Sequence, residues 1–223
     1  MLTALQVAGG PARAGVLRQD LRTLVAPRNL SLAAAGLGAS AIAHRWDNAA
    51  DERLRGAALF RATSGLTDVY GESLFNLSAS LGVYLFARAA HRAELRAVSS
   101  DLLRALCITQ AVIGPIKYGV RRRRPDGSNR LSFPSGHAAN AFATAGVLGR
   151  RYGPRAGVPL CLLGAFVGAG RIAGGHHFLS DVVAGSALGA IVGCAVTRTE
   201  AARVSLLPVP THGGWTLAVQ VER

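Results

Sequence analysis

The sequence predicts an all-α fold: a six-helix transmembrane bundle with short interfacial helices and a small strand-like C-terminal tail. Half of the residues are hydrophobic (50%), only 17% are charged, and the mean hydropathy is +0.28. A soluble domain of this size normally carries more charge. Nearly every long segment is also apolar without a clear polar face, which favours a membrane bundle over the buried helices of a soluble protein.

Six apolar stretches define the predicted spans. A membrane-spanning helix needs about 20 apolar residues, with a range of about 17–25, so several of these stretches are at or below the lower limit. The first and fourth are rich in Ala and Gly, and small residues let helix backbones approach closely in a bilayer. The stretches cover residues 29–44, 71–90, 101–117, 137–150, 156–171 and 181–197.

The chain divides into three parts. Residues 1–27 predict an amphipathic or irregular N-terminal segment, because glycines and a proline interrupt its apolar start. Residues 28–198 contain all six apolar stretches and are the integral membrane domain. Residues 199–223 are a C-terminal tail, in which two short strand-like runs around Thr211–Gly214 predict a β-hairpin.

The net charge of +13 comes almost entirely from arginine, since Lys117 is the only lysine. The arginines are spread over loops without a nucleic-acid motif, so we expect no nucleic-acid partner. With six spans, the loops 117–136 and 171–180 emerge on one face, and both termini and two arginine-rich turns on the other. The positive-inside rule makes the second face cytoplasmic. This predicts a multi-pass protein of the inner (plasma) membrane whose loops 117–136 and 171–180 face the periplasm or exterior.

A histidine and an aspartate stand four residues apart at the start of the last apolar stretch, as His177 and Asp181. Side chains at this spacing meet on one face of a helix, so we expect Asp181 to accept a hydrogen bond from His177. This bond would fix the tautomer and leave the other ring nitrogen as a nucleophile. The alternative is an ordinary helix N-terminus capped by Ser180, with Asp181 favoured by the helix dipole.

A second group, Pro134-Ser135-Gly136-His137, precedes the fourth apolar stretch. Ser135 is a good N-cap, and the Gly136 amide can approach an anion at a helix N-terminus. His137 in the first turn can give a proton to a leaving oxygen. An ordinary helix cap explains the same residues, whereas a serine hydrolase is disfavoured because the G-x-S-x-G elbow is missing.

Three cations are candidates for binding a phosphate: Lys117, Arg124 and Arg171. Phosphoryl transfer requires neutralised charge on the equatorial oxygens, and guanidinium groups fit that geometry. We interpret Arg121, Arg122 and Arg123 as a solvated or headgroup-facing cluster instead. No cluster of acidic residues suited to magnesium or zinc accompanies these groups, so we expect no metal and no cofactor.

Together these motifs resemble the type-2 phosphatidic acid phosphatase (PAP2) superfamily. The resemblance covers residues 71–197. It consists of Lys117 separated by six residues from Arg124-Pro125, the Pro134–His137 group, and Arg171 separated by five residues from His177, with three more before Asp181. One departure is Gly170, where the family usually has serine. The missing hydroxyl would remove one phosphate hydrogen bond, worth about 0.5–1.5 kcal/mol.

The resemblance implies an integral membrane phosphatase over residues 28–198, with the site at the outer membrane surface. It implies that His177 becomes a phosphohistidine, that Asp181 orients it, and that His137 protonates the leaving group and then activates water. The groups implied to hold the phosphate oxygens are Lys117, Arg124, Ser135, the Gly136 amide and Arg171.

The expected substrate is a phosphomonoester or diphosphate of a membrane lipid, with the bilayer as the other partner. Undecaprenyl diphosphate, phosphatidic acid, phosphatidylglycerol phosphate and lipid A phosphates all fit, and the oligomeric state is left open. A vanadate-dependent haloperoxidase is the first alternative, but those proteins are soluble and lack such apolar spans. A non-catalytic protein that binds lipid phosphates is the second, and the complete motifs argue against it.

Overall fold

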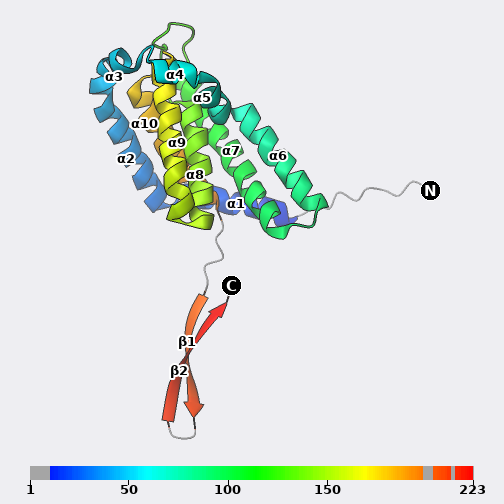
Figure 1. The fold of residues 1–223 in the computed structure, drawn as a ribbon. Helices are drawn as coiled ribbons and strands as arrows, with labels where there is room; N and C mark the ends of the chain where they lie inside the picture. The colour runs from blue at the N-terminus through cyan, green and yellow to red at the C-terminus, as the bar shows by residue number, and fades with distance from the viewer. Residues whose placement is uncertain (1–10, 198–202, 212–213, 223) are drawn as a thin grey trace, which may run out of the picture.

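The computed structural model describes residues 11–197, 203–211 and 214–222, with side chains described over residues 15–197. Within these residues the chain is mainly helical and has one two-stranded sheet (Figure 1). The helices are α1 Pro11–Leu24, α2 Pro27–Ala43, a 3₁₀ turn His44–Trp46, α3 Asp47–Leu54, α4 Ala58–Ala62, α5 Ser64–Gly71, α6 Ser73–Ala89, α7 Ala93–Val120, α8 Gly136–Tyr152, α9 Pro154–Ala173 and α10 Leu179–Val196.

Each of the six predicted apolar stretches forms one helix, in the order α2, α6, α7, α8, α9 and α10. Proline occupies the first position of α2 and of α9, where its fixed φ and missing N–H suit a helix start. The turn between α8 and α9 is a single glycine, Gly153, with φ of +78°. The longest helix is α7, with 28 residues, which extends well before its predicted stretch.

Three of the helices in the described part of the chain are long and apolar enough to cross a membrane: α7, α9 and α10. The helices α2, α6 and α8 have 17 residues each, which is the lower limit for a span. Large apolar side chains are exposed on the outside of the bundle, including Leu74 (73%), Leu162 (68%) and Phe86 (62%). These features fit a helical membrane bundle with a lipid-facing surface.

The tightest helix pair is α8 with α10. Along α10, Gly185, Gly189 and Gly193 face the main-chain carbonyls of Ser135, Ala139 and Ala143 on the α8 side. A Cβ atom at any of these glycines would overlap the α8 backbone. The spacing of four residues keeps all three on one helix face, so the two backbones pack directly against each other as in small-residue membrane interfaces.

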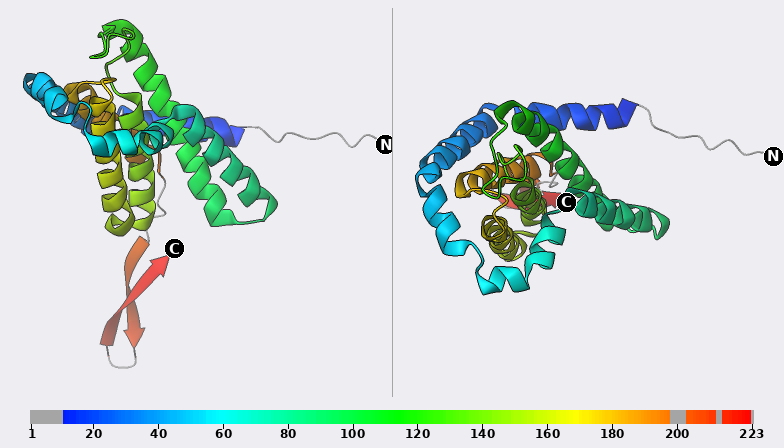
Figure 2. Two further views of the ribbon diagram at one scale, coloured as in Figure 1. Left: turned by 45° about the horizontal axis from the view of Figure 1, so that its top comes forward. Right: turned by 90° about the horizontal axis from the view of Figure 1, so that it is seen from above.

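The short helices α3, α4 and α5 curve around one end of the bundle (Figure 2). The loop 121–135 lies at this same end, as does the turn 174–178 between α9 and α10, while the α6–α7 and α8–α9 turns lie at the opposite end (Figure 1). The two loops that carry the candidate residues therefore share one end of the molecule, as six helices of alternating direction require.

The two ends of the chain are described in part. Residues 11–24 of the predicted N-terminal segment form α1, and residues 1–10 lie outside the described part. In the tail, β1 Arg203–Thr211 pairs antiparallel with β2 Gly214–Glu222, with Thr211 opposite Gly214. Residues 198–202 and the predicted turn residues 212–213 lie outside the described part.

Candidate active site

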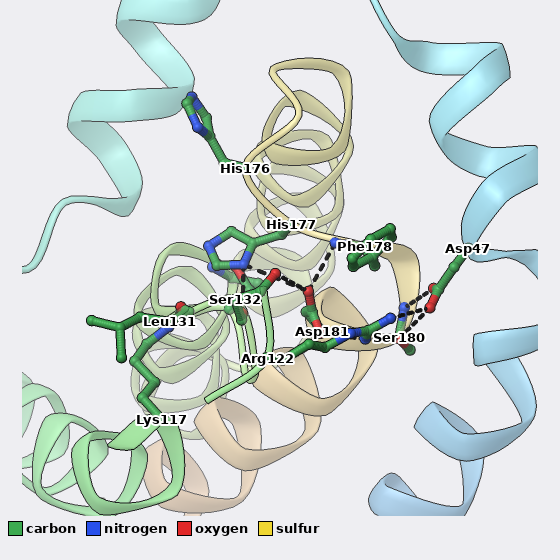
Figure 3. Close-up of polar contacts among 12 residues, drawn as sticks. Asp47, Lys117, Arg122, Leu131, Ser132, His176, His177, Phe178, Ser180 and Asp181 are labelled. Atoms are coloured by element: carbon green, nitrogen blue, oxygen red, sulfur yellow. Dashed lines mark hydrogen bonds and ion pairs between the residues drawn. The ribbon is translucent and has the colours of Figure 1, made fainter. Parts of the chain in front are cut away.

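Main-chain hydrogen bonds join the loop 121–135 to the α9–α10 turn and to the first turn of α10. The amide of Asp126 donates to the carbonyl of Gly175 at 2.9 Å, and the amide of Ser135 donates to the carbonyl of Asp181 at 2.9 Å. These contacts bring together segments far apart in the sequence, and the side chains around His177 meet between them (Figure 3).

His177 is held by a main-chain carbonyl. Its Nδ1 lies 2.7 Å from the carbonyl oxygen of Ser132, and a carbonyl oxygen only accepts, so Nδ1 carries the hydrogen. The Oδ2 atom of Asp181 is 3.9 Å from the same nitrogen, too far for a hydrogen bond. The predicted direct bond between His177 and Asp181 is therefore wrong, because His177 precedes α10 and the helical i, i+4 geometry does not apply to it.

Asp181 acts on His177 indirectly, through Ser132. Its Oδ2 accepts from the hydroxyl of Ser132 at 2.5 Å and from the amide of Phe178 at 2.9 Å. The helix α10 begins at Leu179 with Phe178 as its N-cap residue, so Asp181, not Ser180, caps the first turn. Asp181 thus caps the helix in place of Ser180, which was the expected cap, and also fixes the position of Ser132, whose carbonyl holds His177.

Arg122 occupies the centre of a buried ionic network. Its guanidinium donates to Asp181 Oδ1 at 2.6 Å, to Asp47 Oδ2 at 2.7 Å and to the Ser180 hydroxyl at 2.7 Å. It also lies over the ring of Phe178, 4.2 Å from its centroid. The interpretation of Arg122 as a solvated or headgroup-facing residue is therefore wrong, whereas Arg121 and Arg123 are exposed.

Asp47, the first residue of α3, fixes this network to the start of α10. Its two carboxylate oxygens accept from the amide and the hydroxyl of Ser180, each at 2.8 Å. Its side chain is only 4% exposed. Because the α3 segment lies across the end of the bundle, Asp47 links this covering segment to the residues around His177.

The three candidate cations surround the same region. Lys117 donates to the carbonyl of Leu131 at 2.8 Å, and its Cε is 3.9 Å from where a Cβ of Gly136 would lie. The Nε atoms of Arg124 and Arg171 are buried without a hydrogen-bond partner among the described residues. Buried guanidinium groups rarely leave a donor unpaired, so these two N–H groups are suited to an anion.

Arg171 is also paired with a carboxylate that the sequence did not indicate. Its Nη1 donates to Asp68 on α5, and the Arg171 side chain is 8% exposed while that of Asp68 is 53% exposed. The Nη1 group of Arg171 is thus bonded to the protein, and its Nε–H group remains available to a ligand.

The Pro134–His137 group has the predicted helix start. Ser135 is the N-cap of α8, and its hydroxyl accepts from the amide of Ala138 at 3.4 Å. His137 follows in the first turn, with its side chain 19% exposed. Its Nε2 lies 3.6 Å from Glu72 Oε2, and its ring packs so closely on Gly71 that a Cβ there would be 2.6 Å from the ring.

The electrostatic surroundings keep His177 neutral. Burial lowers the pKa of His177 to about 4, and the positive charges of Lys117 and Arg124 act in the same direction while Asp181 opposes them. The ring is 1% exposed. A neutral imidazole with its hydrogen on Nδ1 has a lone pair on Nε2, which is the form that a nucleophile requires.

The structure explains why glycine stands at position 170, where the resembled family usually has serine. A Cβ on Gly170 would lie 2.8 Å from Cγ2 and 3.0 Å from Oγ1 of Thr67 on α5. Thr67 is 2% exposed, and its hydroxyl donates to the carbonyl of Ser64 at 2.9 Å. The space for a side chain at position 170 is therefore filled from α5.

Several residues around the site were missed by the sequence analysis. Ser132, Asp47, Asp68 and Glu72 have no motif of their own, and they lie on segments whose arrangement the apolar pattern does not specify. Arg122 lay within a motif, but a run of four arginines, 121–124, gave no sign of which one binds the carboxylates of Asp47 and Asp181. Within residues 15–197 no group of three His, Cys, Asp or Glu side chains is arranged to hold a metal ion.

The sequence of this chain is similar to those of known phosphatases. Residues 100–205 match the model of the PAP2 superfamily. The chain is 38% identical over 97 residues to the lipid A 1-phosphatase of Porphyromonas gingivalis, covering 42% of this chain and 22% of that protein. It is also 38% identical over 106 residues to a decaprenylphosphoryl-5-phosphoribose phosphatase of Mycobacterium tuberculosis, covering 43% of this chain and 58% of that one. The chain thus spans less than two thirds of either relative.

Two solved structures share the fold. One is a transmembrane PAP2 type phosphatidylglycerolphosphate phosphatase from Bacillus subtilis, with a TM-score of 0.53 and 20% identity over 82% of this chain and 92% of that one. The other is Aquifex aeolicus LpxE, with a TM-score of 0.53 and 22% identity over 70% of this chain and 92% of that one. The segment that matches the PAP2 superfamily, residues 100–205, contains all three motifs.

Proposed function

We propose that this chain is an integral membrane lipid phosphatase that hydrolyses a phosphomonoester or diphosphate of a membrane lipid through a phosphohistidine. The single observation that carries the proposal is the state of His177. It is buried, its Nδ1 donates to the Ser132 carbonyl, and no hydrogen bond to its Nε2 is present among the described residues. The family and its named relatives support the same reaction.

In the first step, Nε2 of His177 attacks phosphorus while the bond from phosphorus to the leaving oxygen breaks. His137 in its imidazolium form gives its proton to that oxygen. In the second step, neutral His137 removes a proton from water as the water oxygen attacks phosphorus. The phosphorus–nitrogen bond then breaks, and inorganic phosphate leaves with both histidines restored.

Protein groups alone neutralise the transferring phosphoryl group in this mechanism. Lys117 and the unpaired Nε donors of Arg124 and Arg171 supply the positive charge. Ser135 contributes its hydroxyl hydrogen and Gly136 its amide at the N-terminus of α8, where the helix dipole favours an anion. Asp181 positions Ser132, and through it His177. The proposed reaction is therefore independent of metal ions.

The proposed topology has six membrane crossings by α2, α6, α7, α8, α9 and α10. The arginine-rich turns at the end opposite the site support a cytoplasmic location for that end by the positive-inside rule. The site would then face the periplasm or exterior of the inner (plasma) membrane. Exposed apolar side chains on the bundle, such as Leu74 and Leu162, would contact the lipid tails.

The relatives narrow the substrate to lipid-linked phosphates. One relative is named for lipid A and another for a decaprenyl-linked phosphoribose, so undecaprenyl diphosphate, phosphatidic acid, phosphatidylglycerol phosphate and lipid A type phosphates are the compounds to test. The full chain, purified in detergent, should release inorganic phosphate from at least one of them, and chelator should leave the rate unchanged.

The matched control uses two histidines changed in the same way. His177→Asn should abolish turnover and the acid-labile phosphoenzyme, whereas His91→Asn, at the α6–α7 turn, should leave both intact. Near-normal activity of the His177 variant would contradict the proposed nucleophile. Bromide oxidation with added vanadate, without phosphate release, would instead indicate an oxidoreductase, and binding without either reaction a lipid-phosphate binding protein.

A further inference from the structure

The ring of His137 is positioned by packing on the main chain. Within residues 15–197 neither ring nitrogen has a hydrogen bond, since Oε2 of Glu72 is 3.6 Å from Nε2. The ring lies against Gly71, where a Cβ atom would come within 2.6 Å of it. A proton donor must lie within hydrogen-bond reach of the oxygen that it protonates. The position of Gly71 therefore controls where the proposed acid points.

A buried asparagine holds Gly71, the last residue of α5, in place. The Nδ2 group of Asn140 donates to the carbonyl of Gly71 at 3.0 Å and to the hydroxyl of Ser73, the first residue of α6, at 2.8 Å. Asn140 follows His137 by three residues on α8, so the two side chains share one helix face. The junction between α5 and α6 is thus bonded to the helix that carries His137.

A glutamine on α7 fixes the direction of this amide. Nε2 of Gln110 donates to Oδ1 of Asn140 at 2.7 Å. An asparagine amide has one accepting oxygen and two N–H donors, and the bonds to Gln110 and to the α5–α6 junction use all of them. A rotated amide would place its oxygen against the Gly71 carbonyl, where neither group can donate. Asn140 is fully buried, so an unmade bond would leave a buried polar group without a partner.

A purely structural role is the alternative, because amide side chains between membrane spans also hold helices together. The bonds of Asn140 have a particular target, however, since they reach the main chain on which the His137 ring lies. A misplacement of about 1 Å can lower a rate by about 100-fold. Without these bonds the α5–α6 junction would be free to move away from His137, and the ring would lose its fixed direction.

We propose that Asn140, oriented by Gln110, is a positioning residue that fixes the proton donor His137 through the main chain of Gly71. This inference rests on the proposed function and assigns two further residues a role in that reaction. Asn140 transfers no proton itself. It sets the distance over which a proton moves from His137 to the leaving oxygen in the first step, and from water to His137 in the second.

A double-mutant cycle with the full chain in detergent tests this role. The substrate is whichever of the four lipids named above the wild type hydrolyses fastest, labelled on the phosphate that is released, and the readout is the rate of phosphoenzyme formation. Asn140→Ala should lower this rate by about 10–100-fold with little change in KM. In a His137→Asn background the same change should lower it further by no more than about twofold, because the group that Asn140 positions is already missing.

The matched control is Asn29→Ala on α2, since Asn29 also donates from Nδ2 to a main-chain carbonyl, that of Thr23 at 2.7 Å, and the rate should not change. Gln110→Met keeps the length of the side chain and should lower the rate by about 3–10-fold, the effect of one neutral hydrogen bond. It replaces Asn140→Ala in the cycle if that variant does not fold. Its own control is Thr109→Val, whose buried hydroxyl has no hydrogen-bond partner within residues 15–197.

Two results would overturn the inference and leave the phosphatase function intact. One is a normal rate in the folded Asn140→Ala protein, and the other is a double variant in which the losses from Asn140→Ala and His137→Asn multiply in full. Either would show that the amide network only holds the helices together. If the wild type releases no phosphate from any of the four lipids, the proposed function fails and this inference fails with it.

Discussion

The carbonyl of Ser132 accepts a hydrogen bond from Nδ1 of His177 at 2.7 Å, and the carboxylate of Asp181 lies 3.9 Å from the same nitrogen. The tautomer of the proposed nucleophile is therefore fixed by the main chain. The carboxylate acts indirectly, because Asp181 Oδ2 accepts from the Ser132 hydroxyl at 2.5 Å. Side-chain replacement cannot remove the carbonyl, so the tautomer should survive changes at either residue.

This relationship predicts a moderate effect of removing the Asp181 charge. In enzymes whose carboxylate itself fixes the histidine tautomer, the Asp→Asn change lowers kcat by about 10⁴-fold. Here Asp181→Asn should lower kcat by only about 10–100-fold, the equivalent of one charged hydrogen bond of about 1.5–3 kcal/mol. Ser132→Ala should cost a similar or smaller factor. Rates of phosphoenzyme formation measure both, and a 10⁴-fold loss in a folded Asp181→Asn protein would show that the carboxylate holds the imidazole directly.

The ion pair between Arg122 and Asp47 predicts coupled effects on stability. Removing one partner leaves a buried charge without its counterpart, which costs about 3–5 kcal/mol. Arg122→Gln should lower the midpoint of thermal unfolding in detergent by about 6–12 °C. Adding Asp47→Asn to that variant should cost less than the same change in the wild type, because the contact is already lost.

The matched control for this network is Arg123→Gln, which changes an exposed neighbour in the same loop and should move the midpoint very little. Because Arg122 also bonds Asp181, its variant should lower kcat more than it raises KM. Strictly additive effects of the Arg122 and Asp47 changes would argue that the two side chains do not interact in the membrane-embedded protein.

The lowered pKa of His177, about 4 against a usual value near 6.5, predicts how protonation follows pH. The folded protein binds fewer protons at this ring than the unfolded chain between these two values. The contribution of His177 to stability therefore rises with pH through that window and is lost as pH falls through it. The ring should stay neutral and nucleophilic at pH 5. NMR titration of labelled histidines, assigned with His177→Asn, measures this directly, and a midpoint near 6.5 would contradict the buried environment.

The long helices and the motif positions were predictable from the sequence because each rests on a local pattern. Apolar runs identify α2 and α6 through α10, and the Ser135 cap sits where its side-chain chemistry places it. The convergence of the loops 117–136 and 171–180 followed from six helices alternating in direction. These inferences need no knowledge of side-chain packing.

The partners of the motif residues could not be predicted, because they depend on how α3 and α5 fold over the end of the bundle. Asp47 and Asp68 are ordinary acidic residues in short, charged segments. Arg122 is one of four consecutive arginines. The left-handed turn of Arg121 after α7 and the position of Asp47 determine which of them pairs with the carboxylates. The His177–Asp181 pairing failed for a related reason: the helix begins two residues after the histidine.

The contact between Gly170 and Thr67 predicts a compensated substitution. Serine at position 170 would bring its Cβ within 2.8 Å of the Thr67 methyl group, and such overpacking typically costs about 1–3 kcal/mol. Gly170→Ser alone should therefore lower thermal stability and displace α5, weakening the contact between Asp68 and Arg171. Adding Thr67→Ala removes the two closest of the three crowding atoms, leaving only the Cβ of residue 67 at 3.1 Å, and should restore most of the lost stability.

The control for this substitution is Gly82→Ser on α6, where a Cβ has nothing within 4 Å and the midpoint should stay the same. In the double variant, the serine hydroxyl would lie beside Arg171, where the family usually has it, and should provide one additional phosphate hydrogen bond. KM for the lipid phosphate should then fall to or below the wild-type value, because the shorter side chain at position 67 leaves room for the serine at position 170. If Gly170→Ser is as stable as the wild type, or if Thr67→Ala does not relieve it, the two side chains do not compete for that space.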